Sequence, residues 1–271
     1  MESSIITDNE SLHVDILPQP DDTTCGPTCL HAVYRYYGDD SISLTQVIRE
    51  VRKLKGGGTL AVFLACHALK RGYRAKIYTY NLHVFDPTWF TEGKPVADIA
   101  GRLQAQAGTK NVPKLKTATE GYLEFLSLGG ELRFEDLTTG LLRKFLKRSL
   151  PIITGLCSTY LYRSMREVGA ENRDDDVRGE PTGHFAVLCG YNKDERSVLV
   201  ADPYQLNPVS HSQYYSLSIE RVVCSILLGI LTYDANFLII EPKGPKKQEE
   251  KNADSSSGQR SEGMAPGHRR H

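Results

Sequence analysis

The sequence has no excess of charge of either sign. Its 33 lysine and arginine residues balance 33 aspartate and glutamate residues, so the formal net charge is zero. A domain that binds nucleic acid through the phosphates usually carries a clear basic excess. We therefore expect no nucleic acid among the partners of this chain.

Long hydrophobic runs are also missing. The best apolar stretch, residues 222–231, is too short for a helix that spans a bilayer. Residues 1–19 are polar and acidic, and they lack the apolar centre of a secretory signal peptide. These absences predict a chain with no membrane span and a cytoplasmic location.

The six cysteines are scattered and form no framework of close spacings. In a chain of this size without a secretory signal, such cysteines are more typical of free thiols than of disulfides. Cys25 and Cys29 lie one helical turn apart, but a zinc site would need a second pair of ligands. We therefore expect Cys29 to be a core thiol, and we expect neither a metal nor a cofactor.

Hydrophobic periodicity predicts helices first and strands later. The segments with helical spacing are residues 25–37, 43–54, 60–71 and 135–148. The segments rich in β-formers are residues 73–80, 152–156, 184–191, 197–204 and 236–240. This order predicts an α+β fold with one core, in which N-terminal helices pack on a C-terminal antiparallel sheet.

The ends of the chain differ in composition from its middle. Residues 1–16 are typical of a flexible N-terminal arm, and residues 243–271 have almost no large apolar side chain, which is typical of a disordered tail. We expect one domain over residues 17–242. Within it, the charged segment 160–182 is predicted to be a surface loop that gates or selects the substrate.

The most informative segment runs from Gln19 to Cys29. Cys25 stands at the predicted start of the first helix and is followed by Gly26 and Pro27. Unpaired backbone N–H groups and the positive end of the helix dipole favour a thiolate there, and the thiolate is the nucleophile. Gln19, six positions upstream, can donate a hydrogen bond to an oxyanion.

A cysteine nucleophile needs a base, which a third group usually holds in place. The predicted hairpin that turns at residues 193–195 supplies both groups. His184 opens its first strand and Asp202 closes its second, so folding brings the imidazole and the carboxylate to the same end. The pattern alone does not bring them to Cys25.

Each of these residues also has an ordinary structural explanation. A lone cysteine near a helix start is more often a small buried hydrophobe, and an aspartate before proline is a common turn former. The order Gln19, Cys25, His184, Asp202 in one chain favours the catalytic interpretation. The remaining cysteines are expected to be structural core thiols: Cys66, Cys157, Cys189 and Cys224.

These motifs resemble those of a known family. Gln19, Cys25-Gly26-Pro27, Gly183-His184 and Asp202-Pro203 are similar to the motifs of the bacteriocin-processing (double-glycine) cysteine peptidases, family thirty-nine of the cysteine peptidases. The resemblance covers roughly residues 17–204 and implies a papain-like fold. It implies that Cys25 is the nucleophile, that His184 is the base, that Asp202 orients the histidine, and that Gln19 helps to form the oxyanion hole.

Two features differ from the family members that are fused to exporters. Those members often carry an acidic residue just before the cysteine, whereas this chain has Thr24. The chain also has no membrane span and no Gly-rich nucleotide-binding loop. It is therefore similar to a stand-alone soluble member, with a peptide or protein as substrate and an oligomeric state that the sequence leaves open.

The sequence thus predicts a cysteine peptidase that hydrolyses a peptide or amide bond through a thioester intermediate. The same site can pass the acyl group to an amine, which would make the protein an acyltransferase or transglutaminase-like enzyme. A third alternative is a peptide-binding module that has kept its cysteine without catalysis.

Overall fold

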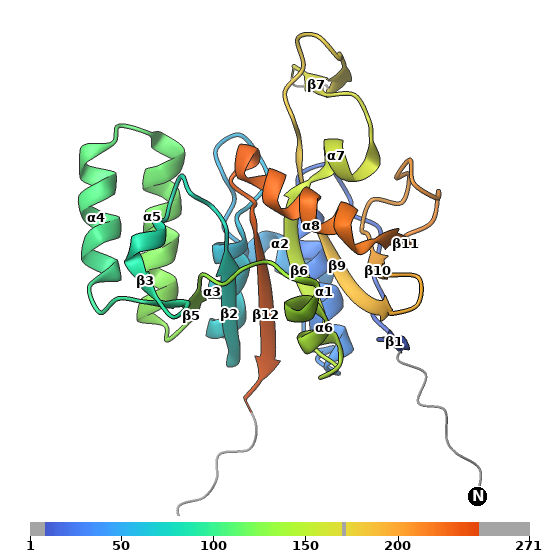
Figure 1. The fold of residues 1–271 in the computed structure, drawn as a ribbon, viewed down its shortest axis with the longest axis horizontal. Coiled ribbons are helices and arrows are strands. Elements are labelled where there is room, and N and C mark those ends of the chain that lie inside the picture. The colour runs from blue at the N-terminus through green and yellow to red at the C-terminus, as the bar shows by residue number, and fades with distance from the viewer. Residues whose placement is uncertain (1–8, 170–171, 244–271) are drawn as a thin grey trace, which may run out of the picture.

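One large sheet runs through the protein. The computed structural model describes residues 9–169 and 172–243. The strands of the large sheet are β1 (Asn9–Ser11), β2 (Tyr73–Thr79), β5 (Glu131–Arg133), β6 (Ile152–Cys157), β9 (Gly183–Asn192), β10 (Ser197–Ala201), β11 (Tyr214–Ser218) and β12 (Asn236–Pro242). Their order is β11-β10-β9-β6-β12-β2-β5, with β1 paired to β9, and only β2 and β5 are parallel (Figure 1).

Helices cover both faces of this sheet. They are α1 (Cys25–Tyr36), α2 (Leu44–Glu50), α3 (Ala61–Lys70), α4 (Ile99–Thr109), α5 (Pro113–Ser127), α6 (Thr139–Leu146), α7 (Ser158–Tyr162) and α8 (Ile219–Leu228). Figure 1 shows α1 and α3 behind the sheet, α8 in front of it, and α4 and α5 beyond the β5 edge. The predicted α+β fold is confirmed.

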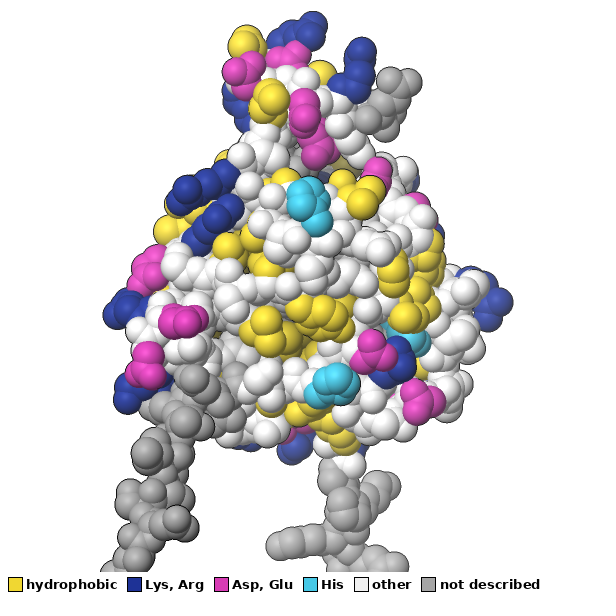
Figure 2. Space-filling view, turned by 90° about the vertical axis from the view of Figure 1, so that its right-hand side faces the viewer, with side chains coloured by type: hydrophobic (Ala, Val, Ile, Leu, Met, Phe, Trp, Pro, Cys, Tyr) yellow, Lys and Arg dark blue, Asp and Glu magenta, His cyan; other side chains and the backbone are white. Residues whose placement is uncertain are grey.

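Two short hairpins and two 3₁₀ turns complete the described part of the chain. The 3₁₀ turns are η1 (Pro87–Trp89) and η2 (Gly229–Thr232), and the hairpins are β3 (Phe90–Thr91) with β4 (Lys94–Pro95) and β7 (Glu167–Val168) with β8 (Arg173–Asp174). The second hairpin projects from the top of the molecule in Figure 1. Figure 2 shows acidic and basic side chains mixed on this projection. The segment predicted to be a surface loop therefore contains α7 and a projecting hairpin.

Helix boundaries differ from the predictions where side-chain hydrogen bonds determine where a helix begins. The predicted helix at residues 135–148 begins only at Thr139, because the Thr138 hydroxyl accepts a hydrogen bond from the Leu141 N–H at 3.1 Å. α3 begins at Ala61 without a side-chain cap, and the hydroxyl of nearby Thr59 donates to the Arg52 carbonyl at 2.8 Å. Local hydrogen bonds of this kind are not visible in periodicity.

The N-terminal segment needs a correction. Residues 9–16, expected to belong to a flexible arm, pack on the sheet: β1 pairs with β9, and the side chains of Leu12, Val14 and Ile16 are buried. The alternation of buried and exposed residues there is the period of a strand lying on a core. Residues 1–8 and the predicted disordered tail from residue 244 onward lie outside the described residues.

The cysteines follow the predictions with one exception. Cys29, Cys66, Cys157 and Cys189 are buried, and the Cys29 thiol donates to the Phe185 carbonyl at 3.3 Å. Cys224 was expected in the core, but it lies exposed on α8. The apolar neighbours of Cys224 belong to the amphipathic helix α8. Val222 and Ile226 lie on its buried face, whereas Cys224 lies on its exposed face. Among the helices of the described ranges, none is long and apolar enough to cross a membrane.

Candidate active site

The predicted site residues meet at one end of the β9 and β10 strands. Because β9 and β10 are antiparallel, the start of β9 and the end of β10 lie at the same end of the pair. His184 is the second residue of β9, and Asp202 directly follows β10. α1 begins at Cys25, and its Gly26 lies against Phe185, the residue after His184.

His184 and Asp202 form a buried pair. The His184 Nε2 atom lies 2.8 Å from Asp202 Oδ1, and the Asp202 side chain is fully buried. An ionised carboxylate can only accept hydrogen bonds, so Nε2 carries the proton. When the imidazole is neutral, this tautomer leaves the lone pair on Nδ1 of His184.

Cys25 is the third member of the cluster. It lies close enough to His184 to raise the pKa of the imidazole, and its own side chain is half-buried. Burial lowers the pKa of His184, but the charges of Asp202 and Cys25 and their hydrogen bonds outweigh burial and raise it to about 10. The structure therefore brings together three residues that are spread over most of the sequence.

Two tyrosine hydroxyls hold the other carboxylate oxygen of Asp202. Tyr215 and Tyr162 donate to Oδ2 at 2.6 and 2.8 Å, and the Tyr204 N–H donates to Oδ1 at 2.8 Å. Burial raises the pKa of Asp202, but His184 and these donors outweigh it, so the pKa is lowered overall. Asp202 thus remains ionised beside the histidine at neutral pH.

Sequence reasoning missed both tyrosines. Tyr215 lies on β11, and the alternation of the segment YYSLS was a signal for that strand. Tyr162 ends α7, a helix of five residues inside the segment predicted to be a loop. No periodicity can be read from so short a helix, so no local signal pointed to Tyr162.

The loop before Cys25 is hydrogen-bonded to the residue that follows Asp202. The Gln19 N–H donates to the carbonyl of Pro203, the residue after Asp202, at 2.9 Å. The Gln19 side chain donates from Nε2 to the Asp21 carbonyl at 3.0 Å, and its Oε1 is buried with no hydrogen-bond partner in the described part of the chain. Gln19 therefore lies beside the cluster, with its amide turned toward its own loop.

Gly26 explains why α1 can approach the sheet so closely. A Cβ atom at this position would lie 2.7 Å from Thr59 Cγ2 and 3.2 Å from Phe185 Cδ2. The first distance is shorter than any normal carbon–carbon contact. A glycine after the cysteine is therefore required for the N-terminus of α1 to sit against β9.

This arrangement is suited to acyl chemistry. A thiol beside an imidazole that a carboxylate orients is the arrangement that activates a cysteine nucleophile. In residues 9–169 and 172–243, no group of three or more His, Cys, Asp or Glu side chains forms a metal site.

The sequence profile of the Peptidase_C39 like family matches residues 11–221, so the chain belongs to this family. The resemblance to family thirty-nine of the cysteine peptidases is thereby confirmed. Among curated protein sequences, none matches the chain.

Solved peptidase structures are similar to this chain at low identity. The peptidase domain of Streptococcus ComA, a bi-functional ABC transporter involved in quorum sensing, is 14% identical with a TM-score of 0.39, over 85% of this chain and 100% of that chain. A double glycine motif protease from the AMS/PCAT transporter, in complex with the leader peptide, is 16% identical with a TM-score of 0.41, over 86% and 95%. A C39-like peptidase from Bacillus anthracis is 12% identical with a TM-score of 0.44, over 88% and 99%.

Proposed function

We propose that the protein is a cysteine peptidase that hydrolyses a peptide or amide bond. The observation that carries this proposal is the buried His184–Asp202 pair, in which His184 Nε2 lies 2.8 Å from Asp202 Oδ1, with Cys25 close enough to help raise the pKa of His184. The family of the chain supports the same reaction class.

The first half of the reaction forms a thioester. His184 Nδ1 takes the proton of the Cys25 thiol, and the thiolate attacks the carbonyl carbon of the substrate. The tetrahedral intermediate collapses when His184 gives that proton to the leaving amine. The carbon–nitrogen bond breaks, the amine leaves, and the acyl group stays on Cys25.

The second half releases the acid. His184, now neutral again, takes a proton from water, and the resulting hydroxide attacks the thioester carbonyl. The carbon–sulfur bond then breaks, and the thiolate of Cys25 is restored beside the protonated His184. Asp202 holds the imidazole in the productive tautomer through both halves, and Tyr162 and Tyr215 hold Asp202.

We assign Gln19 and the Cys25 backbone N–H to the oxyanion. The first N–H groups of a helix have no acceptor within it, so the Cys25 N–H is suited to a developing negative charge. The Gln19 amide has two N–H donors, and one of them is given to the Asp21 carbonyl. The other is assigned to the oxyanion, and the Gln19–Pro203 backbone bond keeps the loop at the site.

We also propose that the enzyme works in the cytoplasm. All six cysteines are unpaired, although four of them are buried. Free thiols, one of them the proposed nucleophile, are suited to a reducing compartment.

A peptide library read by mass spectrometry tests the reaction. We expect the wild type to cleave a subset of peptides and the Cys25→Ala variant to cleave none. Equal cleavage by both proteins would refute the assignment. Added amines serve as a second reading: if amine adducts replaced the hydrolysis products, the acyltransferase alternative would be the correct one.

A further inference from the structure

The outer side of α8 and η2 is apolar, although it is exposed. Residues 222–232, which belong to these two elements, include no charged side chain. Val222 and Ile226 face the core and are fully buried. Figure 1 shows α8 in front of the sheet, so its outer side faces the viewer. We call the exposed residues of this segment the α8 surface: Cys224, Leu227, Leu228 and Leu231.

The α8 surface has the composition of a contact site. Its three leucines lie close together in one segment, and they are 37–57% exposed. Single exposed leucines are ordinary on a protein surface, but a helix that is apolar on all sides is normally covered on all sides. Exposed apolar patches mark contacts with another molecule or with a membrane. We therefore expect a partner to cover the α8 surface.

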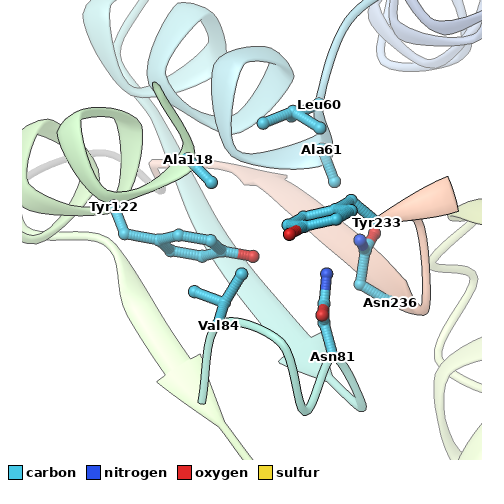
Figure 3. A pocket seen from close by; sticks show the side chains of 8 residues that line it. All are labelled: Leu60, Ala61, Asn81, Val84, Ala118, Tyr122, Tyr233 and Asn236. Atoms are coloured by element: carbon cyan, nitrogen blue, oxygen red, sulfur yellow. The ribbon is translucent and has the colours of Figure 1, made fainter. Parts of the chain in front are cut away.

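The cavity beside η2 does not hold such a partner. Figure 3 shows this cavity between the start of α3, the loop after β2, α5 and Tyr233, the residue after η2. Its volume of about 10 Å³ is room for about one water molecule. A partner at this end of the molecule therefore binds on the surface and not inside it.

Basic side chains stand at both ends of the α8 surface. Arg221 lies in the first turn of α8, and Arg163 directly follows α7, which packs on α8. At the other end, Lys114 Nζ donates to the carbonyl of Thr232, the last residue of η2, at 2.9 Å. Lys114 also faces the buried carboxyl of Asp234, so the two arginines carry most of the free positive charge.

The two arginines form no ion pair within residues 9–169 and 172–243. Arg221 Nε is buried and has no hydrogen-bond partner there, and burial and the charge of Arg163 lower the pKa of Arg221. Glu220, the acidic residue beside Arg221, is paired with Arg196. Two neighbouring guanidinium groups without a counter-charge are suited to phosphate groups.

We propose that the α8 surface binds a membrane surface that contains anionic phospholipids. The leucines enter the boundary between head groups and acyl chains, and Arg163 and Arg221 contact the head-group phosphates. Apolar burial and charge attraction are the two contributions that peripheral membrane binding combines. The proposal does not depend on the peptidase function, because no residue of the α8 surface takes part in the proposed reaction.

Flotation with lipid vesicles tests the leucines. We expect the wild type to float with phosphatidylcholine vesicles that contain about 30% phosphatidylserine, and to be released as the salt concentration rises. The double variant Leu227→Gln, Leu231→Gln should bind these vesicles at least ~10-fold more weakly, because it loses apolar contact. Leu128→Gln is the matched control, since Leu128 is also exposed but lies at the opposite end of α5 from Lys114.

The arginines are tested by changing the lipid. The double variant Arg163→Gln, Arg221→Gln should lose roughly 5-fold in affinity per arginine on the phosphatidylserine vesicles. On vesicles of phosphatidylcholine alone it should bind as the wild type does. Arg74→Gln, which removes an exposed arginine that pairs with Glu241, is the control. Equal losses on both kinds of vesicle would overturn the assignment of the arginines to anionic lipid.

A fluorescent label on Cys224 tests the position directly. In a Cys25→Ala background Cys224 is the exposed thiol, because the other four cysteines are buried. An environment-sensitive dye there should shift to the blue on the phosphatidylserine vesicles, even if the double leucine variant does not fold. An unchanged emission, no flotation of the wild type, or equal flotation of the double leucine variant would overturn the proposal. Self-association through the leucines without vesicle binding would assign the α8 surface to a second copy and overturn it as well.

Discussion

His184 Nε2 lies 2.8 Å from Asp202 Oδ1, and this bond decides which nitrogen of the imidazole remains for Cys25. Since the carboxylate holds the proton on Nε2, only Nδ1 has a lone pair to accept the thiol proton. The pair is almost closed to water, with 9% of the His184 side chain and none of the Asp202 side chain exposed. In the proposed mechanism, Cys25 at the start of α1 thereby has a base with a fixed tautomer.

Removing one tyrosine hydroxyl tests whether Asp202 needs its donors. Tyr215→Phe deletes the 2.6 Å hydrogen bond to Asp202 Oδ2, and we expect a loss of roughly 1.5–3 kcal/mol in the free energy of unfolding. We also expect a lower kcat, because the carboxylate is less firmly held. Chemical denaturation and peptide cleavage measure the two effects. Tyr36→Phe, whose hydroxyl bonds the Ser149 carbonyl at the surface, is the control, and equal losses in both variants would contradict the prediction.

Gln19→Ala tests the oxyanion assignment separately from the nucleophile. We expect kcat to fall by roughly 10²–10³, because one donor to the oxyanion is lost. Alkylation of Cys25 by iodoacetamide should proceed at the wild-type rate, since that displacement forms no oxyanion. Gln46→Ala, on the surface of α2, is the control. An unchanged kcat in Gln19→Ala would remove this residue from the oxyanion hole.

Two glycine substitutions should change stability in opposite directions. Gly26→Ala would force a Cβ to within 2.7 Å of Thr59, and overpacking of this kind costs about 1–3 kcal/mol. Gly108→Ala, inside α4 with open space around it, should stabilise by about 0.5–1 kcal/mol, because alanine favours the helix. Thermal unfolding measures both. A stable Gly26→Ala variant would show that α1 does not need this close approach to the sheet.

The part of this site that could be predicted from the sequence is the part fixed by local pattern. The helix start places Cys25, and the β9–β10 hairpin places His184 and Asp202 at the same end, because both follow from periodicity and turn residues. The approach of α1 to β9 depends on packing at Gly26, between residues far apart in the chain. Tyr162 and Tyr215 reach Asp202 through tertiary structure alone, so no spacing rule could have found them.

The buried carboxyl of Asp234 predicts an unusual dependence of stability on pH. Burial raises its pKa to about 7, although Thr232 and Lys114 oppose the rise. Its folded pKa lies above the unfolded value of about 3.9, so its contribution is complete below that value and is lost as the pH rises through 7. Asp234→Asn, which cannot ionise, should therefore gain stability relative to the wild type between pH 4 and pH 8.

Asp39 supplies the opposite slope as a control. Burial raises its pKa, but Ser41 and Arg71 outweigh burial and lower it to about 2. Its contribution is present above the unfolded pKa and is lost only as the pH falls toward 2. Asp39→Asn should thus lose stability at neutral pH, and the loss should shrink on acidification. Urea denaturation at several pH values measures both variants, and parallel slopes would refute the assignment for Asp234.

The rate at which Cys25 is alkylated, with and without His184, tests the central claim most directly. The measurement needs a Cys224→Ala background, because Cys224 is exposed and would also react, whereas the other four cysteines are buried. Intact-mass analysis then follows one thiol. We predict fast alkylation at pH 6 and a rate at least ~10-fold lower in His184→Ala, with the difference closing above about pH 9, where an isolated thiol is itself largely ionised. Equal rates at pH 6 with and without His184 would contradict a catalytic thiol–imidazole pair.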